Sequence, residues 1–137
     1  MSPYEGASYN ETDPFDLPEW LGQTEVTWAA ERGLGTGHRV AGALTASGHD
    51  AVPCDVLAVD EAYPEPVAGD TVRVRAHQLW RYGEVLVAGD GDRLLLLVPG
   101  SRLPTETVLE AVGRLARAVG APAGSYAVRL RVGSDGG

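Results

Sequence analysis

Cys54 is the only thiol in the chain, and together with three histidines it is the first candidate for catalytic chemistry. A nucleophilic thiol needs a histidine or another cation beside it, because the thiolate is the form that attacks. His38, His49 and His77 are candidates for that neighbour, but their spacing does not indicate which of them lies close to Cys54. Cysteine is also among the residues most often buried, and this one lies in the apolar run 52–59. The sequence therefore favours an inert core thiol over a nucleophile.

The other polar residues show no spacing typical of a metal or phosphate site. The histidines do not form a pattern such as H-x-x-x-H, so we expect neither a metal nor a cofactor. The glycines at positions 33, 35 and 37 resemble part of a dinucleotide fingerprint, but His38 stands where the third glycine is needed, and a turn is predicted instead. Paired carboxylates for acid–base catalysis could come from one acidic region, although nothing in the sequence sets their separation; its members are Asp55, Asp60, Glu61 and Glu65.

The stretch from Asp70 to Gly83 holds the best candidate for a binding surface. Its apolar residues recur at i, i+4, i+7 and i+8, which is one face of an α-helix; they are Val72, Ala76, Leu79 and Trp80. Alternation over residues 72–76 also fits a strand, but we favour a helix that Asp70 caps and Gly83 ends.

A basic and aromatic surface follows from this helix. It comprises Arg73, His77, Trp80 and Arg81, with Arg75 and Tyr82 across the helix. Arginine and aromatic side chains dominate the hot spots of protein interfaces. We therefore expect this surface to bind another protein or a second copy of the chain, although an ordinary solvated helix face has the same residue types.

Charge is distributed unevenly along the chain. The net charge is −8, with thirteen acidic residues and two arginines in residues 1–70, against six acidic residues and nine arginines in residues 71–137. An acidic protein repels phosphate backbones, so nucleic acid is not expected as a partner. Residues 1–31 hold seven acidic residues and no basic one. This acidic segment is a candidate occupant of the arginine surface, either within one chain or exchanged between the chains of a homodimer.

The compartment follows from the cysteine count and the absence of long apolar runs. A single cysteine excludes an internal disulfide and suits a reducing cytoplasm. No stretch approaches the ~18 consecutive apolar residues of a membrane span, and the first residues lack the pattern of a signal peptide. We therefore expect a cytoplasmic protein with no membrane partner.

The first residues divide into two parts. Residues 1–13 are polar and predicted to form a disordered acidic arm. The next segment, 14–22, is predicted to form one helical turn, and its large apolar residues are Phe15, Leu17, Trp20 and Leu21. This turn either packs on the chain's own sheet or, through Phe15 and Trp20, docks onto another protein.

The remaining pattern predicts an α+β fold. Strands are expected over residues 25–30, 39–45, 52–59, 85–87, 94–98 and 126–132, and a long amphipathic helix over 104–119. The run 94–98 is too apolar for one exposed face, so it is expected to be a central strand. Short connections favour a mainly antiparallel sheet of five to six strands with both helices on one face, a two-layer sandwich. One domain is expected over 14–133, followed by a flexible tail at 134–137.

The predicted order is short helix, three strands, helix, two strands, long helix, strand. Over about residues 14–120 this order, with the small size and acidic charge, resembles the small acidic chaperones of bacterial secretion systems. Size, charge segregation and the lack of catalytic spacing favour a non-catalytic protein-binding module: chaperone-like, adaptor or regulatory subunit of an assembly. The alternative is a small enzyme or small-molecule-binding domain with a pocket between sheet and helices.

Overall fold

The computed structural model describes residues 10–34, 38–60, 68–100 and 103–132. The strands are β1 (Asn10–Glu11), β2 (Val26–Leu34), β3 (Arg39–Val40), β4 (Gly42–Thr45), β5 (Val52–Ala58), β6 (Leu86–Asp90), β7 (Arg93–Val98) and β8 (Tyr126–Val132). The helices are α1 (Trp20–Gln23), α2 (Asp70–Arg81) and α3 (Thr105–Ala118), with 3-10 turns η1 (Pro14–Asp16) and η2 (Ala123–Ser125). No helix within the described ranges has both the length and the apolarity to cross a membrane.

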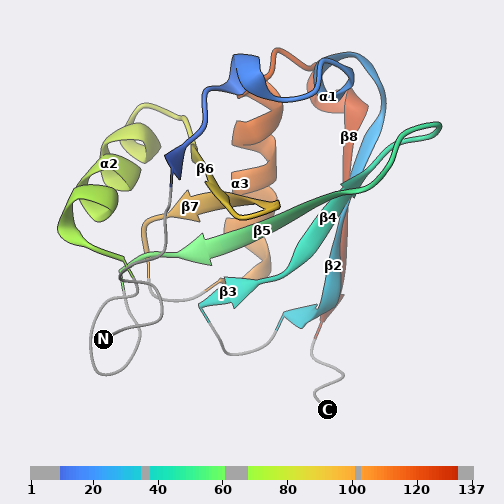
Figure 1. The fold of residues 1–137 in the computed structure, drawn as a ribbon. Helices are drawn as coiled ribbons and strands as arrows, with labels where there is room; N and C mark the ends of the chain where they lie inside the picture. The colour runs from blue at the N-terminus through green and yellow to red at the C-terminus, as the bar shows by residue number, and fades with distance from the viewer. Residues whose placement is uncertain (1–9, 35–37, 61–67, 101–102, 133–137) are drawn as a thin grey trace.

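One mixed sheet is the centre of the α+β fold (Figure 1). Its order is β1-β6-β7-β5-β4-β2-β8, with β3 paired beside β5. The pairs β5–β7 and β2–β8 are parallel, whereas the other described pairs are antiparallel. The sheet is therefore mixed rather than antiparallel throughout. The parallel pairs arise because helices lie within the connections: α3 leads from β7 to β8, which joins β2 in parallel, and α2 with β6 lies between β5 and its parallel neighbour β7.

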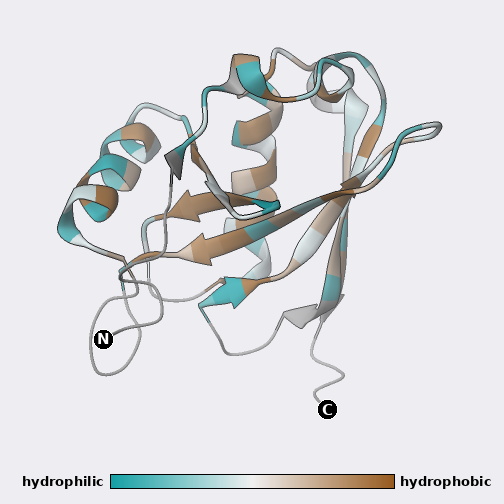
Figure 2. Cartoon of the chain, in the orientation of Figure 1, coloured by the Kyte–Doolittle hydropathy of each residue, from teal (hydrophilic) through white to brown (hydrophobic). Residues whose placement is uncertain are grey.

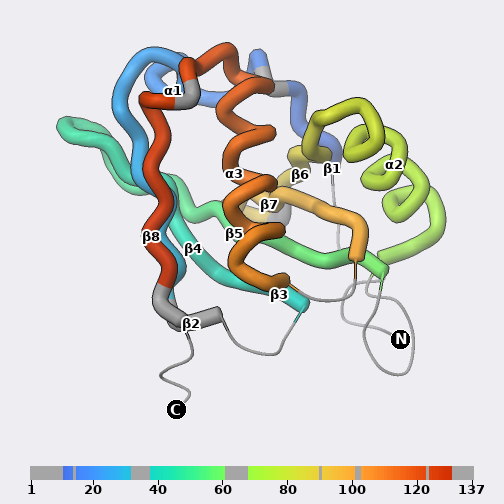
Figure 3. Tube along the Cα trace, turned by 180° about the vertical axis from the view of Figure 1, so that it is seen from behind, coloured from blue at the N-terminus to red at the C-terminus, as the bar shows by residue number. Residues whose placement is uncertain are grey.

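The two long helices lie on opposite faces of the sheet, so the prediction that both cover one face is wrong. Leu95 and Leu97 of β7 pack in a cluster with Ala76 of α2, whereas Leu96 and its neighbours pack in a second cluster with Leu115 of α3. Figure 3, from behind, shows α3 in front of β7 and β5, with α2 to the side. The chain thus forms three layers here: helix, sheet and helix.

The run of leucines in β7 confirms the predicted central strand. Successive strand residues point to opposite faces, and Leu95, Leu96, Leu97 and Val98 are all fully buried. A helix covers each face, which explains why the run shows no alternation between apolar and polar residues. In Figure 2 the neighbouring strands β5 and β7 are correspondingly apolar, whereas much of α2 is hydrophilic.

Helix α2 confirms the predicted helix, but its N-terminus differs from the prediction. Gly69 occupies the N-cap position, and no side chain caps the helix. Asp70 instead lies in the first turn and pairs with Arg73 one turn later. At the other end Gly83 has a φ of 82°, the left-handed conformation that glycine adopts without steric cost.

The predicted strand around Trp28 packs against an unusually close neighbour. Val26 and Trp28 of β2 are fully buried, and the Trp28 Nε1–H donates a hydrogen bond of 2.8 Å to the carbonyl oxygen of Cys54. Gly42 of β4 lies against the indole ring, where a Cβ atom would collide with the ring and with the Ala29 carbonyl oxygen. A glycine in this strand is therefore explained by the close approach of the tryptophan.

Several predictions concern the ends of the described segments. Residues 1–9 of the predicted arm, residues 134–137 of the predicted tail and the glycines at 35 and 37 lie outside the described residues. Asn10–Glu11, however, belong to the sheet as β1, within the range predicted to be disordered. Gly33 belongs to β2 rather than to a turn.

Candidate functional site

The outer side of α2 carries a network of ion pairs centred on Asp60, which follows β5. The Asp60 carboxylate accepts hydrogen bonds from His77 Nε2 at 2.9 Å and Arg73 Nε at 3.4 Å. It also accepts one from the backbone N–H of Gly100, after β7, at 2.8 Å. Asp60 thus ties α2 to the ends of two parallel strands, and two of the predicted binding residues are involved in this contact.

The network lowers the pKa of Asp60. Burial opposes its ionisation, but the hydrogen bonds from the Gly100 N–H and from His77 outweigh that effect, so the pKa lies below its ordinary value. Arg73 also pairs with Asp70 at 2.9 Å, and its side chain is 32% exposed. Arg73 and His77 are therefore structural as well as surface residues.

Arg81 completes this part of the predicted surface. It is exposed, and with the preceding network it lines a cleft of about 510 Å³ on the outer side of α2. The lining residues are Asp60, Asp70, Arg73, Val74, His77, Gln78 and Arg81. Val74 is 56% exposed, so an apolar side chain lies among the charged ones.

Trp80 lies apart from these residues, because it turns toward α3. Its ring packs against the core, and the guanidinium carbon of Arg114 lies 3.4 Å from the ring centroid. Arg114 also donates to the carbonyl oxygens of Trp80 and Glu84 at 2.6 and 3.2 Å and pairs with Glu110 at 2.6 Å. A cation over an indole face, held by carbonyls, links the two helices. Trp80 is therefore mainly a packing residue.

Trp20 and Phe15 do not join the α2 surface. Trp20 of α1 stacks on His49 with ring centroids 4.7 Å apart and packs partly against the core. Phe15 of η1 is 94% exposed. Figure 1 shows α1 and α2 on different sides of the molecule. The six predicted binding residues thus form at least two separate surfaces, and Phe15 is exposed on the one away from α2.

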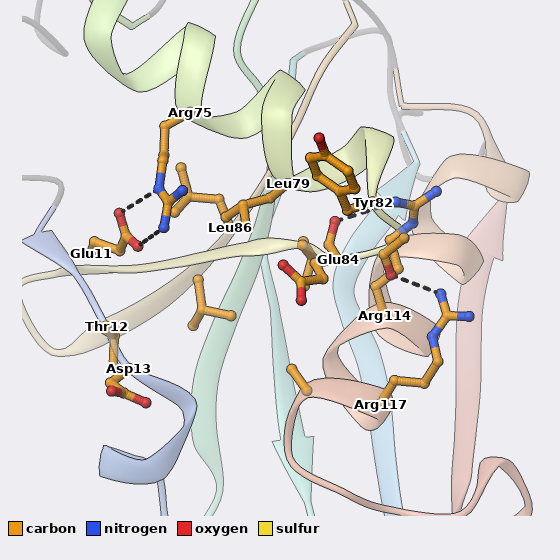
Figure 4. Close-up of a pocket in the computed structure, with 14 residues that line it drawn as sticks. Glu11, Thr12, Asp13, Arg75, Leu79, Tyr82, Glu84, Leu86, Arg114 and Arg117 are labelled. Atoms are coloured by element: carbon orange, nitrogen blue, oxygen red, sulfur yellow. Dashed lines mark hydrogen bonds and ion pairs between the residues drawn. The ribbon is translucent and has the colours of Figure 1, made fainter.

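Two further clefts border α2, in the region between sheet and helices where the alternative hypothesis expected a pocket, although the sequence did not indicate their lining residues. The larger, of about 760 Å³, lies between β1, β6, α2 and α3, and Figure 4 shows its walls. The smaller, of about 580 Å³, lies between α2 and the sheet, and its lining includes the nearly fully buried Leu86, Ala88 and Leu97. Glu11 and Arg75 line both clefts and form an ion pair of 2.9 Å.

The sequence also gave no sign that Asp55 lies at the centre of a buried ion-pair cluster. Asp55 of β5 is 1% exposed and accepts hydrogen bonds from Arg39, from Arg93 and from the backbone N–H of Gly42. Burial opposes its ionisation, but the hydrogen bonds from Arg93 and Arg39 lower its pKa overall. Arg93 further pairs with Glu31. These partners come from four strands that the sequence could not place side by side.

The two described members of the predicted carboxylate set, Asp55 and Asp60, lie in separate ion-pair networks. Asp55 and Asp60 each have their own cationic partners, as set out above, and residues 61 and 65 lie outside the described ranges. Within the described ranges, no three acidic, histidine or cysteine side chains are grouped closely enough to hold a metal ion.

Cys54 is expected to resist an aromatic disulfide reagent in the folded protein and to react fully in denaturant. The thiol is fully buried; burial raises its pKa, and the neighbouring Asp55 carboxylate raises it further. Absorbance of the released aromatic thiol measures the reaction. Rapid labelling under native conditions would show that Cys54 is accessible and would support a catalytic role for it.

Comparisons with known proteins give no relative. No protein-family model matches the chain, no curated protein matches it, and no solved structure matches it.

Proposed function

We propose that this chain is a non-catalytic protein-binding module, chaperone-like, adaptor or regulatory, whose docking element is α2. The observation that carries the proposal is the position of α2 among three clefts, of about 760, 580 and 510 Å³, each lined by α2 residues. A helix flanked by hollows offers a partner both a ridge and grooves. Such relief favours shape-complementary contact over a large area.

Exposure of the α2 side chains supports the same proposal. Ala76 is the only α2 residue that is fully buried, whereas Val74 and Tyr82 at the C-cap are 56% and 77% exposed. Arg81 is exposed between them. Exposed tyrosine and arginine beside an apolar side chain are the types that anchor protein interfaces. The partner is another protein or a second copy of the chain.

The placement of the reactive groups is consistent with docking rather than catalysis. The thiol of Cys54 has no contact with solvent, and Asp55 lies in a cluster of arginines. The imidazole of His77 contacts Asp60, which also joins α2 to the sheet. Each group therefore has a structural role that explains its position.

A small-molecule site in the 760 Å³ cleft is the second candidate. Its volume falls within the range of about 300–1,000 Å³ typical of ligand pockets. Arg114 lines it, and the Arg114 Nε is a buried nitrogen without a hydrogen-bond partner among the described residues. Binding of a small anion in the cleft, observed as chemical-shift changes at Arg114, would favour this candidate.

The proposal is tested by Arg81→Glu combined with Val74→Ser. Both side chains are exposed, so we expect the melting temperature to change little, as surface substitutions usually alter stability by less than about 0.5 kcal/mol. Partner affinity should fall by about 2 kcal/mol or more, roughly thirtyfold. Arg73 is left intact, because its ion pairs with Asp60 and Asp70 contribute to the fold.

A matched control makes the result specific. Arg129→Glu with Leu109→Ser likewise changes one arginine and one aliphatic residue, on β8 and α3, where both side chains are exposed. Each variant is compared with the wild type by co-purification from the native host and by light-scattering mass. If the α2 variant keeps the partners and mass of the wild type, α2 is not the docking element.

A further inference from the structure

The two-residue strand β1 occupies an edge of the sheet beside α2. Asn10 and Glu11 pair antiparallel with Gly89 and Ala88 of β6, and the Thr12 N–H donates to the Val87 carbonyl oxygen at 2.7 Å. Figure 1 shows β1 beside β6, on the side that faces α2. A short acidic segment is thus bound to the sheet by backbone hydrogen bonds, with α2 alongside.

The Glu11 side chain adds a second contact, to α2. Its two carboxylate oxygens accept hydrogen bonds from Arg75 Nε at 3.2 Å and Arg75 Nη2 at 2.9 Å, as Figure 4 shows. Such a two-pronged pair fits the planar guanidinium, which a lysine does not reproduce. Both side chains are about half exposed, 49% for Glu11 and 46% for Arg75.

This ion pair lies where two clefts meet. Glu11, Arg75 and Leu86 line both the 760 Å³ cleft and the 580 Å³ cleft. The two clefts are therefore adjacent along α2, with the pair between them, and together they are called the trough below. Beyond the pair, the apolar lining residues are Leu79, which is partly exposed, and Val87, Ala88 and Leu97, which are nearly fully buried.

We propose that this trough binds an extended segment of a partner protein, with one carboxylate for Arg75, in the place that β1 takes in the free chain. The segment pairs with β6 as an added strand, and one carboxylate binds Arg75. The proposal rests on the proposed function, since it names the groove beside α2 and the chemistry of the partner. In the free chain Glu11 already makes both of these contacts, because its backbone pairs with β6 and its carboxylate pairs with Arg75.

β1 is a weak occupant of this place. Only two residues pair with β6, which is five residues long, so a longer partner strand gains further backbone hydrogen bonds. An ion pair between half-exposed side chains adds little. The advantage of β1 is its covalent attachment, equivalent to a local concentration of roughly millimolar.

The charges around the trough limit the partner to few acidic residues. Arg114 and Arg117 line the wall formed by α3, but the carboxylates of Asp13 and Glu84 line the same cleft. A polyacidic segment meets repulsion there, whereas one carboxylate opposite Arg75 does not. The partner segment is therefore extended, with an acidic residue at the position equivalent to Glu11 and mainly uncharged neighbours.

The test uses a fluorescent peptide with the sequence of residues 8–16, SYNETDPFD, and the full-length chain. Glu11→Ala with Thr12→Pro removes the carboxylate and the N–H that hold β1 in place. This opened variant should bind the peptide about tenfold more tightly than the wild type, measured by anisotropy. Adding Arg75→Glu should abolish the gain, and a peptide with lysine in place of the glutamate should restore it.

The controls separate this proposal from the proposed function. Glu11→Gln, which removes only the charge, is the milder variant if the opened one does not fold, and it should give a smaller gain. Equal peptide affinity in all variants overturns the inference. So does a dimer of the opened variant that binds no peptide, because the occupant is then a second copy. In either case the Arg81→Glu and Val74→Ser result still decides whether α2 docks a partner.

Discussion

Leu97→Ala is expected to lower the free energy of unfolding by about 2–5 kcal/mol. Leu97 is fully buried in β7 and belongs to the cluster in which Ala76, Val72 and Leu79 of α2 pack against the sheet. Truncation removes apolar contacts and leaves a cavity that helix and strand cannot both close. The loss should loosen α2 in particular, since its contact with the sheet passes through this cluster.

Denaturant titration measures the effect, with Leu109→Ala as a matched control. Leu109 lies on α3 and is 45% exposed, so its truncation leaves little cavity. The control should change stability by less than about 1 kcal/mol. Equal unfolding midpoints for Leu97→Ala and the wild type would mean that β7 is not the centre of the core.

Asp55→Asn is expected to cost about 2–4 kcal/mol, because it leaves Arg39 and Arg93 without their common carboxylate. Their shortest contacts to Asp55 are both 2.6 Å, and the carboxyl group is 1% exposed. The value lies below that of a fully buried pair, since the arginine side chains are 24% and 31% exposed and solvent screens them.

Asp55 also makes the free energy of unfolding depend on pH. Hydrogen bonds from Arg93 and Arg39 outweigh the effect of burial and lower the pKa of Asp55 in the folded state. Its stabilising effect is therefore complete above the ordinary aspartate pKa of about 4 and is lost as the pH falls through the lower folded value. Unfolding free energy measured from pH 7 downward should converge for the wild type and Asp55→Asn in acid. Asp50→Asn, at an exposed position, is the control for the substitution itself. A constant gap between Asp55→Asn and the wild type at every pH would contradict this assignment.

Local patterns in the sequence predicted the local elements well. The stripe of Ala76 and Leu79 indicated α2, and the run 94–98 indicated a strand covered on both faces. These features depend on residues close together in the chain, where helix and strand periodicity differ. The left-handed glycine after α2 was predictable for the same reason.

The faces of the sheet and the distant contacts were not predictable in this way. Nothing in the α2 stripe indicates which face of the sheet it covers, because either face of β7 is equally apolar. Glu11 and Arg75 are 64 residues apart, and Arg93 and Asp55 are 38 apart. Their contacts depend on the order of strands in the sheet, and the alternation of apolar and polar residues that identifies a strand does not specify its neighbours. Trp80 was assigned in part to the binding surface because its partner, Arg114, lies on another helix.

Hydroxyl-radical footprinting of the complex captured with the wild-type chain tests the docking role of α2 most directly. Val74 and Tyr82 report on α2, and Leu109, exposed on α3, is the internal control. We predict that oxidation of Val74 and Tyr82 falls several-fold in the complex while Leu109 remains as reactive as in the free chain. Unchanged oxidation of Val74 and Tyr82, with protection elsewhere, would contradict the account and place the interface on another surface.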